Sequence, residues 1–262
     1  MESLWQDIRY GARTLYKNPG FTAVAVLALA LGIGANTAII SVVNELLLRP
    51  LPFKDPERIA MLWEVTPEGR HQNTTSRANF LQWREQSQSF DGVAAFADRR
   101  LNLTGVGDAE EVSAQLASSG LFRILGVEPV LGRTFAKEDS QPGAARVAVL
   151  GYGLWQRRFG GDRGVIGKPV TLNGDSYTVI GVMPAGFEWH IRSRSGTGRP
   201  AEIWTVLPMP AAGSESDGEW QGRFLSVVAR LKPGVSFEQA DAELKTIERR
   251  LSQDSPRFNK DY

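Results

Sequence analysis

The chain contains no cysteine among its 262 residues and only two histidines. The absence of cysteine excludes disulfides, thiolate nucleophiles and cysteine-ligated metal sites, and it leaves the redox compartment undecided. His71 and His190 offer little imidazole for acid–base or metal chemistry, and we expect both to be loop, packing or surface residues. Acidic residues are scattered, so no carboxylate pair is favoured as a catalytic acid and base. We therefore expect no enzyme activity, no catalytic residue, no cofactor and no metal site.

Nucleotide-binding motifs are also missing. The stretch "GGDRGVIGKP" is superficially similar to a phosphate-binding loop, which needs Gly, four residues and then Gly-Lys-Ser/Thr. Asp162 occupies the position of the first glycine and Pro169 that of the hydroxyl residue, so we expect a turn before a strand and no binding of ATP. The 30 basic and 29 acidic residues give a formal net charge of +1. That balance gives no long-range attraction to nucleic acid or anionic lipid.

Charge is absent altogether from residues 18–44, within "NPGFTAVAVLALALGIGANTAIISVVNELLLRPLPF". These 27 residues exceed the roughly 20 that cross a hydrocarbon core. A cleaved signal peptide has a shorter apolar core and a small-residue cleavage site, which "GIGANTA" could supply. Apolar residues resume at Ile39, however, which favours an uncleaved transmembrane helix over a signal peptide or a buried core helix.

Small residues recur within this segment at intervals of four. These candidate helix-packing residues are Ala28, Ala30, Gly32, Gly34 and Ala38. Such spacing creates a smooth surface on which another helix can approach closely. Gly and Ala are also common in membrane spans generally, so the pattern is open to a plainer interpretation. The sharper hypothesis is that the helix packs against partners outside this chain.

The first 17 residues, "MESLWQDIRYGARTLYK", place Leu4, Ile8, Ala12 and Leu15 on one helical face. This pattern predicts an amphipathic helix on the membrane surface. Three basic residues precede the apolar segment and three follow it, so the positive-inside rule gives a tie. A short leading segment is easier to retain in the cytoplasm than to translocate. We therefore expect a cytoplasmic N-terminus and a periplasmic C-terminal domain.

The remainder indicates an α+β fold built from two strand–helix units. "IAMLWEV" predicts a strand, "SRANFLQWREQSQSF" a helix and "DGVAAFADRRLNL" a returning strand. The second unit pairs the strand "RFLSVVARL" with an amphipathic helix that begins at a capping box of Ser236 and Gln239. No strand follows that helix, so we expect one sheet edge to lack a partner.

A β-rich insertion is predicted between the two units. "EEVSAQLAS", "ARVAVLG" and "EIWTVLP" predict strands, and "YGLWQRRFGG" predicts a short helix. Asn173-Gly174 in "KPVTLNGDSYTVIGVMP" predicts a hairpin with a type I′ turn. The expected organisation is a cytoplasmic helix over 1–17, a transmembrane helix over 18–46 and a periplasmic domain over 47–262. Within that domain, split α/β parts cover about 57–102 and 223–262, and the β-rich insertion covers about 103–222.

Two long blocks carry a family resemblance. The segment 18–53 quoted above, followed by "YGLWQRRFGGDRGVIGKPVTLNGDSYTVIGVMPAGFEW", resembles the MacB-like ABC transporter permeases, and within them the duplicated orphan-permease branch. The resemblance covers nearly the whole chain. It implies a MacB-type periplasmic core domain with a porter-like subdomain of strand–helix–strand repeats and a β-rich insertion.

The resemblance also implies partners and a mode of action. In this family a separate cytoplasmic ABC ATPase hydrolyses ATP, and membrane helices transmit its cycle to the periplasmic domain for export. The expected partners are the lipid bilayer, that ATPase, and the remaining permease helices or a second permease copy; nucleic acid is not expected. The family has three further transmembrane helices after the periplasmic domain, and the chain ends before them. We therefore expect it to be a fragment or part of a split permease, the alternative being a single-span anchored interaction or scaffold module.

Overall fold

The computed structural model describes residues 9–10, 13, 16–43, 53–65, 71–72, 74–187, 199–208 and 222–254. The chain divides into two compact units, Met1–Leu51 and Pro52–Tyr262. Five of the first 17 residues are described, namely residues 9, 10, 13, 16 and 17. All five are helical. The predicted surface helix over 1–17 otherwise lies outside the described residues.

The first unit contains one long helix, α2 (Pro19–Val43). At 1.5 Å per residue its 25 residues extend over roughly 37 Å. Several of its large apolar side chains are exposed, with Phe21 at 71% and Leu31 at 72%. Within the described part of the chain, no helix combines the length and the apolar character that crossing a membrane demands. The predicted transmembrane helix over 18–46 is therefore not supported by the structure.

The second unit is organised by one ten-stranded sheet with the order β1-β12-β5-β6-β11-β8-β10-β7, to which β4 and β9 add at the side. Two further short strands, β2 and β3, pair with each other. The strands are β1 (Ile59–Leu62), β2 (Glu64–Val65), β3 (His71–Gln72), β4 (Thr75–Ser76), β5 (Phe90–Thr104), β6 (Glu110–Ala117), β7 (Leu131–Gly132), β8 (Val147–Leu150), β9 (Pro169–Leu172), β10 (Asp175–Val182), β11 (Ile203–Val206) and β12 (Arg223–Leu231). The helices are η2 (Pro56–Arg58), α3 (Arg77–Gln86), α4 (Leu121–Leu125), η3 (Glu138–Ser140), α5 (Tyr152–Phe159), η4 (Arg163–Val165) and α6 (Phe237–Asp254).

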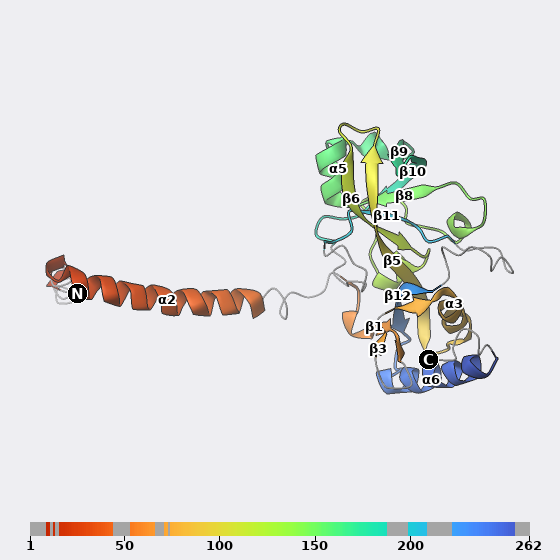
Figure 1. Ribbon diagram of the computed structural model, residues 1–262, viewed down its shortest axis with the longest axis horizontal. Coiled ribbons are helices and arrows are strands. Elements are labelled where there is room, and N and C mark those ends of the chain that lie inside the picture. The colour runs from red at the N-terminus through yellow and green to blue at the C-terminus, as the bar shows by residue number, and fades with distance from the viewer. Residues whose placement is uncertain are drawn as a thin grey trace. The chain divides into compact units, whose positions relative to one another are not determined.

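The porter-like half consists of β1, β12 and the first part of β5, with α3 and α6 on one face (Figure 1). Side chains alternate between the two faces of a strand, so every second residue points to the helices. Val93 and Ala95 of β5 share a buried cluster with Phe80 and Trp83 of α3 and Ile247 of α6. The opposite face packs on α4 through Ala94, Phe96 and Val228.

The β-rich half closes on itself. Pairing runs from β5 to β6, β11, β8, β10 and β9, and β9 pairs back to β5 through Leu103–Leu172 and Thr104–Thr171. This ring forms a small barrel. Its core consists of alternate strand residues, among them Val112, Leu150 and Ile203, together with Leu154 and Trp155 of α5.

Several expected elements are confirmed. Asn173 and Gly174 have φ angles of 50° and 88°, as a type I′ turn requires, and they join β9 to β10. The capping box at α6 is present, with the Gln239 N–H donating to Ser236 Oγ at 3.2 Å and the Ser236 N–H donating to Gln239 Oε1 at 3.0 Å. The mixed α+β character, with a split α/β part and a β-rich part, agrees with the predicted fold class.

Other expectations about elements are wrong in detail. The single strand expected over 59–65 is interrupted at Trp63, because β1 joins the main sheet and β2 pairs with β3. The returning strand β5 extends to Thr104 and serves both halves of the sheet. The predicted boundary between 102 and 103 therefore falls inside a continuous strand, and the domain limits stay predictions.

A buried carboxylate connects β2 to the main sheet. Glu64 is 3% exposed, and its Oε1 accepts hydrogen bonds from the Thr75 hydroxyl, the Asn79 side-chain amide at 2.8 Å and the Ser76 N–H at 3.2 Å. Its Oε2 pairs with Arg223 Nε. Buried carboxylates are tolerated when they are paired and hydrogen-bonded, which Glu64 is on both oxygens. Sequence patterns alone gave no indication of this network.

Glu248 on α6 makes stability depend on pH. Burial, and then the nearby charge of Glu64, raise its pKa from 4.5 to about 7. The folded state therefore binds this proton more tightly than the unfolded state, and its stabilising contribution is lost as pH rises from about 4.5 through about 7. We expect Glu248→Gln to be more stable than the wild type by about 1–2 kcal/mol at pH 8, after allowance for screening by solvent, and equal to it at pH 4.

Urea unfolding of both proteins at several pH values would measure this difference. Carboxyl groups whose pKa is lowered, such as Asp139 beside Arg133, make the stability of both proteins rise with pH. Subtracting one protein's free energy of unfolding from the other's removes this shared contribution. A difference that does not change between pH 4 and pH 8 would contradict the prediction.

Candidate functional site: a cleft beside helix α5

The small residues singled out in the sequence lie on α2. Ala28, Ala30, Gly32 and Gly34 are exposed, and a Cβ added at either glycine would meet nothing within 4 Å. The side chain of Ala38 lies outside the described residues. At about 100° per residue, the row of Ala28 and Gly32 is turned by roughly 200° from the row of Ala30 and Gly34. The residues therefore form two rows on opposite faces of the helix, and their role in packing stays a prediction.

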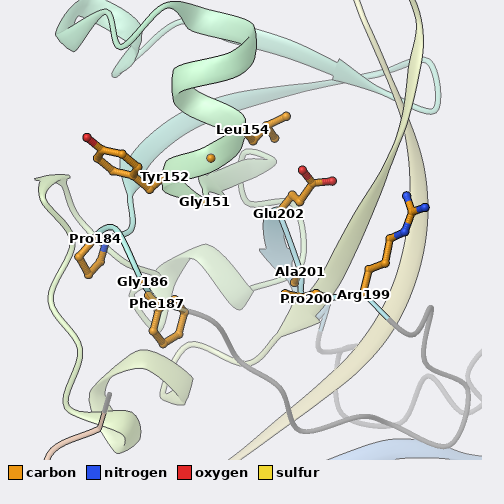
Figure 2. Close-up of a pocket in the computed structure, with 11 residues that line it drawn as sticks. Gly151, Tyr152, Leu154, Pro184, Gly186, Phe187, Arg199, Pro200, Ala201 and Glu202 are labelled. Carbon is orange, nitrogen blue, oxygen red and sulfur yellow. The ribbon is translucent and has the colours of Figure 1, made fainter. Parts of the chain in front are cut away.

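A cleft of about 500 Å³ lies in the second unit beside the start of α5. Figure 2 shows its three walls: the first turn of α5, the loop that follows β10 and the residues that precede β11. The lining residues are Gly151, Tyr152, Gly153, Leu154, Pro184, Gly186, Phe187, Arg199, Pro200, Ala201 and Glu202. The volume is in the range of small-molecule sites.

Main-chain hydrogen bonds hold the walls together. The Gly151 N–H donates to the Glu202 carbonyl at 2.7 Å, and the Met183 N–H donates to the Leu150 carbonyl at 2.8 Å. A Cβ on Gly151 would lie 2.9 Å from that Glu202 oxygen, so the close approach of the two segments requires glycine. The start of α5 is thereby fixed against β11 by the backbone rather than by a side-chain cap.

An ion-pair network occupies the polar edge of the cleft. Arg157 donates to Glu202 Oε1 at 2.8 Å and to Glu110 Oε1 at 2.7 Å. The hydrogen bond that Arg157 donates to Glu202, then the charge of Glu202 and the hydrogen bond to Glu110 with its charge, raise the pKa of Arg157 above its ordinary value. Glu202 is therefore engaged as the acceptor of a guanidinium, and it is a poor candidate for a general base.

Aromatic side chains form the apolar part of the cleft. Phe187 is nearly buried and packs against Trp204 at a ring-centroid distance of 5.5 Å and against Phe122 at 6.0 Å. Tyr152 is 37% exposed and stacks edge-on against Trp155 at 5.5 Å. In Figure 2 Tyr152 stands beside Pro184 at the cleft rim. An apolar wall with one charged edge suits the binding of a ligand or partner segment better than proton transfer.

The stretch compared with a phosphate-binding loop is a turn, as predicted. Asp162 accepts from Lys168 Nζ at 2.7 Å and from the Gly164 N–H at 2.8 Å, and η4 follows it directly. These two bonds lower the pKa of Asp162, with that from Lys168 the larger cause. Lys168 is thus held by the chain's own carboxylate rather than presented to a phosphate.

The side chain of His71 and the whole of His190 lie outside the described residues. Over the part of the chain that is described, no group of three or more His, Asp or Glu side chains is placed to hold a metal ion. The residues of the cleft were not foreseen, since a Gly-Tyr-Gly sequence after a strand is too common to indicate a site.

Comparisons with known proteins identify relatives of the fold. The structure of the extracellular domain of the noncanonic ABC-type transporter YknZ from Gram-positive bacteria is similar, with a TM-score of 0.52 and 16% identity over 75% of this chain and 93% of that one. The periplasmic region of MacB from Actinobacillus actinomycetemcomitans gives a TM-score of 0.54 and 14% identity over 76% of this chain and 87% of the other. At such identities the similarity establishes the fold alone.

A search of curated proteins finds no match. The family model for the MacB-like periplasmic core domain, in contrast, matches residues 22–247 in one continuous stretch. That match covers most of the chain and includes both the porter-like half and the barrel described above. The chain therefore belongs to the family of MacB-like periplasmic core domains.

Proposed function

We propose that this chain is the membrane-anchored periplasmic portion of a MacB-like ABC transporter permease. It couples ATP hydrolysis by a separate cytoplasmic ATPase to movement in the periplasm, and that movement drives export. The observation that carries the proposal is the continuous family match over residues 22–247, which begins inside α2 and ends inside α6. The remaining permease helices, or a second permease copy, complete the assembly.

Membrane anchoring is assigned to α2. Support comes from its 25 residues, from the absence of charge between Asn18 and Asn44, and from its exposed apolar side chains. Exposed Val, Leu and Ile side chains in such number are costly in water and favourable in a bilayer. The basic residues on both sides leave the orientation to be tested directly.

The absence of native cysteine makes a labelling test of topology clean. We expect Lys137→Cys, in an exposed position before η3, to react in intact cells with a maleimide that crosses the outer but not the inner membrane. Arg9→Cys, in the leading segment, should react only after the inner membrane is opened. Labelling of both sites in intact cells would place the N-terminus outside the cytoplasm, and labelling of neither would overturn the periplasmic location.

Anchoring itself is tested by extraction. The full chain should remain with the membrane pellet in alkaline carbonate, and removal of residues 1–51 should release the second unit.

Association with an ABC ATPase is tested by purifying the full chain from native membranes in a mild detergent and identifying the proteins that accompany it. Recovery of an ABC ATPase supports the permease; stable anchoring without any ATPase partner would favour an anchored scaffold module.

A further inference from the structure

Residues 53–58 are the first part of the chain that the structure describes after α2, and we call them the entry strap. They belong to the second unit. The Lys54 N–H donates to the Leu125 carbonyl at the end of α4 at 3.1 Å. At the other end of the strap, Arg58 Nε donates to the Leu231 carbonyl of β12 at 2.9 Å. The strap is therefore attached to both α4 and β12.

A buried arginine joins these two attachments. Arg230 of β12 is 8% exposed. Its Nε donates to the Ile124 carbonyl of α4 at 2.7 Å, its Nη2 donates to the Lys54 carbonyl, and its Nη1 donates to the Asp55 carbonyl at 3.4 Å. The Asp55 carboxylate lies 3.8 Å from Nη1 and forms an ion pair with it. A buried guanidinium is stable only when its donors and its charge have partners, and the strap supplies most of them.

The backbone of the strap is strained at Asp55. Its φ of 44° and ψ of 64° lie in the left-handed region, which residues other than glycine seldom adopt. Arg58 Nη1 pairs with the Asp55 carboxylate at 3.5 Å, and Arg230 bonds to the Asp55 carbonyl. Strain of this kind persists where surrounding contacts impose it. Loss of the Arg230 guanidinium therefore favours a relaxed strap that leaves its present path.

The strap also supports one wall of the cleft beside α5. The Phe53 ring packs edge-on against the Phe187 ring, with centroids 6.5 Å apart. Phe187 lines the cleft (Figure 2), and its ring also contacts Phe122 of α4 at 6.0 Å. Arg230 bonds to both elements that carry these phenylalanines, the strap and α4. Displacement of the strap removes one contact of Phe187 and releases the end of α4, which carries the other.

We propose that the entry strap regulates the cleft beside α5. While the strap is bound to Arg230, Phe187 is held in the wall and the cleft keeps its observed shape. When the strap leaves Arg230, Phe187 loses the Phe53 ring and the wall opens to solvent. The link is reciprocal, so a group that pushes Phe187 outward weakens the binding of the strap. That movement of membrane helices displaces the strap rests on the proposed function, whereas the link itself lies within the second unit.

The test uses the full chain in a neutral detergent, with Ala201→Cys as a reporter in the cleft. Ala201 is half-buried and packs against the cluster that contains Phe187, and the chain has no other cysteine. Arg230→Met keeps the apolar stem and removes the guanidinium, so it should raise the rate of maleimide labelling at position 201 at least about fivefold. Arg163→Met, at an exposed arginine of η4, should leave this rate unchanged.

Amide hydrogen exchange measures the strap itself. The Lys54 N–H should exchange at least about fivefold faster in Arg230→Met, whereas the β9–β10 hairpin should stay protected. Phe53→Ala removes the contact with Phe187 but leaves the bonds of Arg230 to the strap backbone in place. It should raise labelling at position 201 and leave exchange at Lys54 unchanged.

The reciprocal effect is measured after labelling. A bulky aromatic maleimide attached at position 201 should speed exchange at Lys54, because it pushes Phe187 against the strap. This effect should vanish in Phe53→Ala, which lacks the ring that connects the two.

Three results would overturn the proposal. Unchanged exchange at Lys54 in Arg230→Met would show that the arginine does not hold the strap. Faster exchange there with unchanged labelling at position 201 would show that the strap leaves without affecting the cleft. Unchanged labelling in Phe53→Ala would show that Phe187 needs no support from the strap, and this result decides the matter even if Arg230→Met loosens the whole domain. None of these measurements involves an ATPase or transport, so an error in the proposed function would not alter them.

Discussion

Replacing Arg223 with methionine should lower the free energy of unfolding by about 3–5 kcal/mol. The substitution keeps much of the apolar stem but removes the guanidinium that pairs with Glu64 Oε2. Glu64 is buried, and its remaining partners are the neutral groups of Thr75, Ser76 and Asn79. Those groups cannot compensate a full negative charge, so the cost is that of a buried charge without its counter-ion.

Urea unfolding of the full chain in a neutral detergent, followed by tryptophan fluorescence, measures the loss. The double variant Glu64→Gln/Arg223→Met removes both charges and keeps an amide that can bond to the neighbouring groups, so it should recover most of the lost stability. Lys245→Met breaks the exposed pair with Asp241 on α6 and should cost less than about 1 kcal/mol. A double variant no more stable than Arg223→Met alone would show that the buried charge is not the cause.

The sequence predicted those elements whose conformation depends on residues close together in the chain. The turn at Asn173 and Gly174 needs positive φ angles, and the capping box at Ser236 and Gln239 satisfies backbone groups within one turn of helix. Alternation within 223–231 likewise predicted β12, because every second residue from Leu225 to Leu231 lies in the apolar cluster shared with α3 and α6. The division into strand–helix units and a β-rich insertion followed from the order of these elements.

Features that depend on pairing between distant segments could not be predicted. Closure of the barrel rests on Leu103 and Thr104 meeting Leu172 and Thr171, and no short-range pattern encodes that register. The cleft beside α5 needs Gly151 to meet Glu202, two residues far apart in the sequence. Glu64 is a further example, since a lone acidic residue within a predicted strand gives no sign that it will pair with Arg223.

The second large effect is expected at Gly132. This glycine has φ of +70°, and a Cβ built on it would overlap the carbonyl oxygen of Ile180. That oxygen accepts from the Arg133 N–H at 2.8 Å, one of the bonds that hold β7 against β10. We expect Gly132→Ala to lower the free energy of unfolding by about 3 kcal/mol or more, because left-handed backbone strain adds to a backbone clash that no side-chain rotation can relieve.

Gly143→Ala provides the matched control. Gly143 also has positive φ, +81°, but a Cβ there would meet nothing within 4 Å. Only the strain term applies, and the expected loss is about 1 kcal/mol. The difference between the two variants, measured by urea unfolding under the same conditions, isolates the contact between β7 and β10. Because β9 and β7 both pair with β10, loss of β7 should also expose Val130 and Leu131 to faster amide hydrogen exchange while the β9–β10 hairpin stays protected. Equal losses of stability in the two variants would mean that β7 can move away from β10 without lowering the free energy of unfolding. The contact between β7 and β10 would then not contribute to stability.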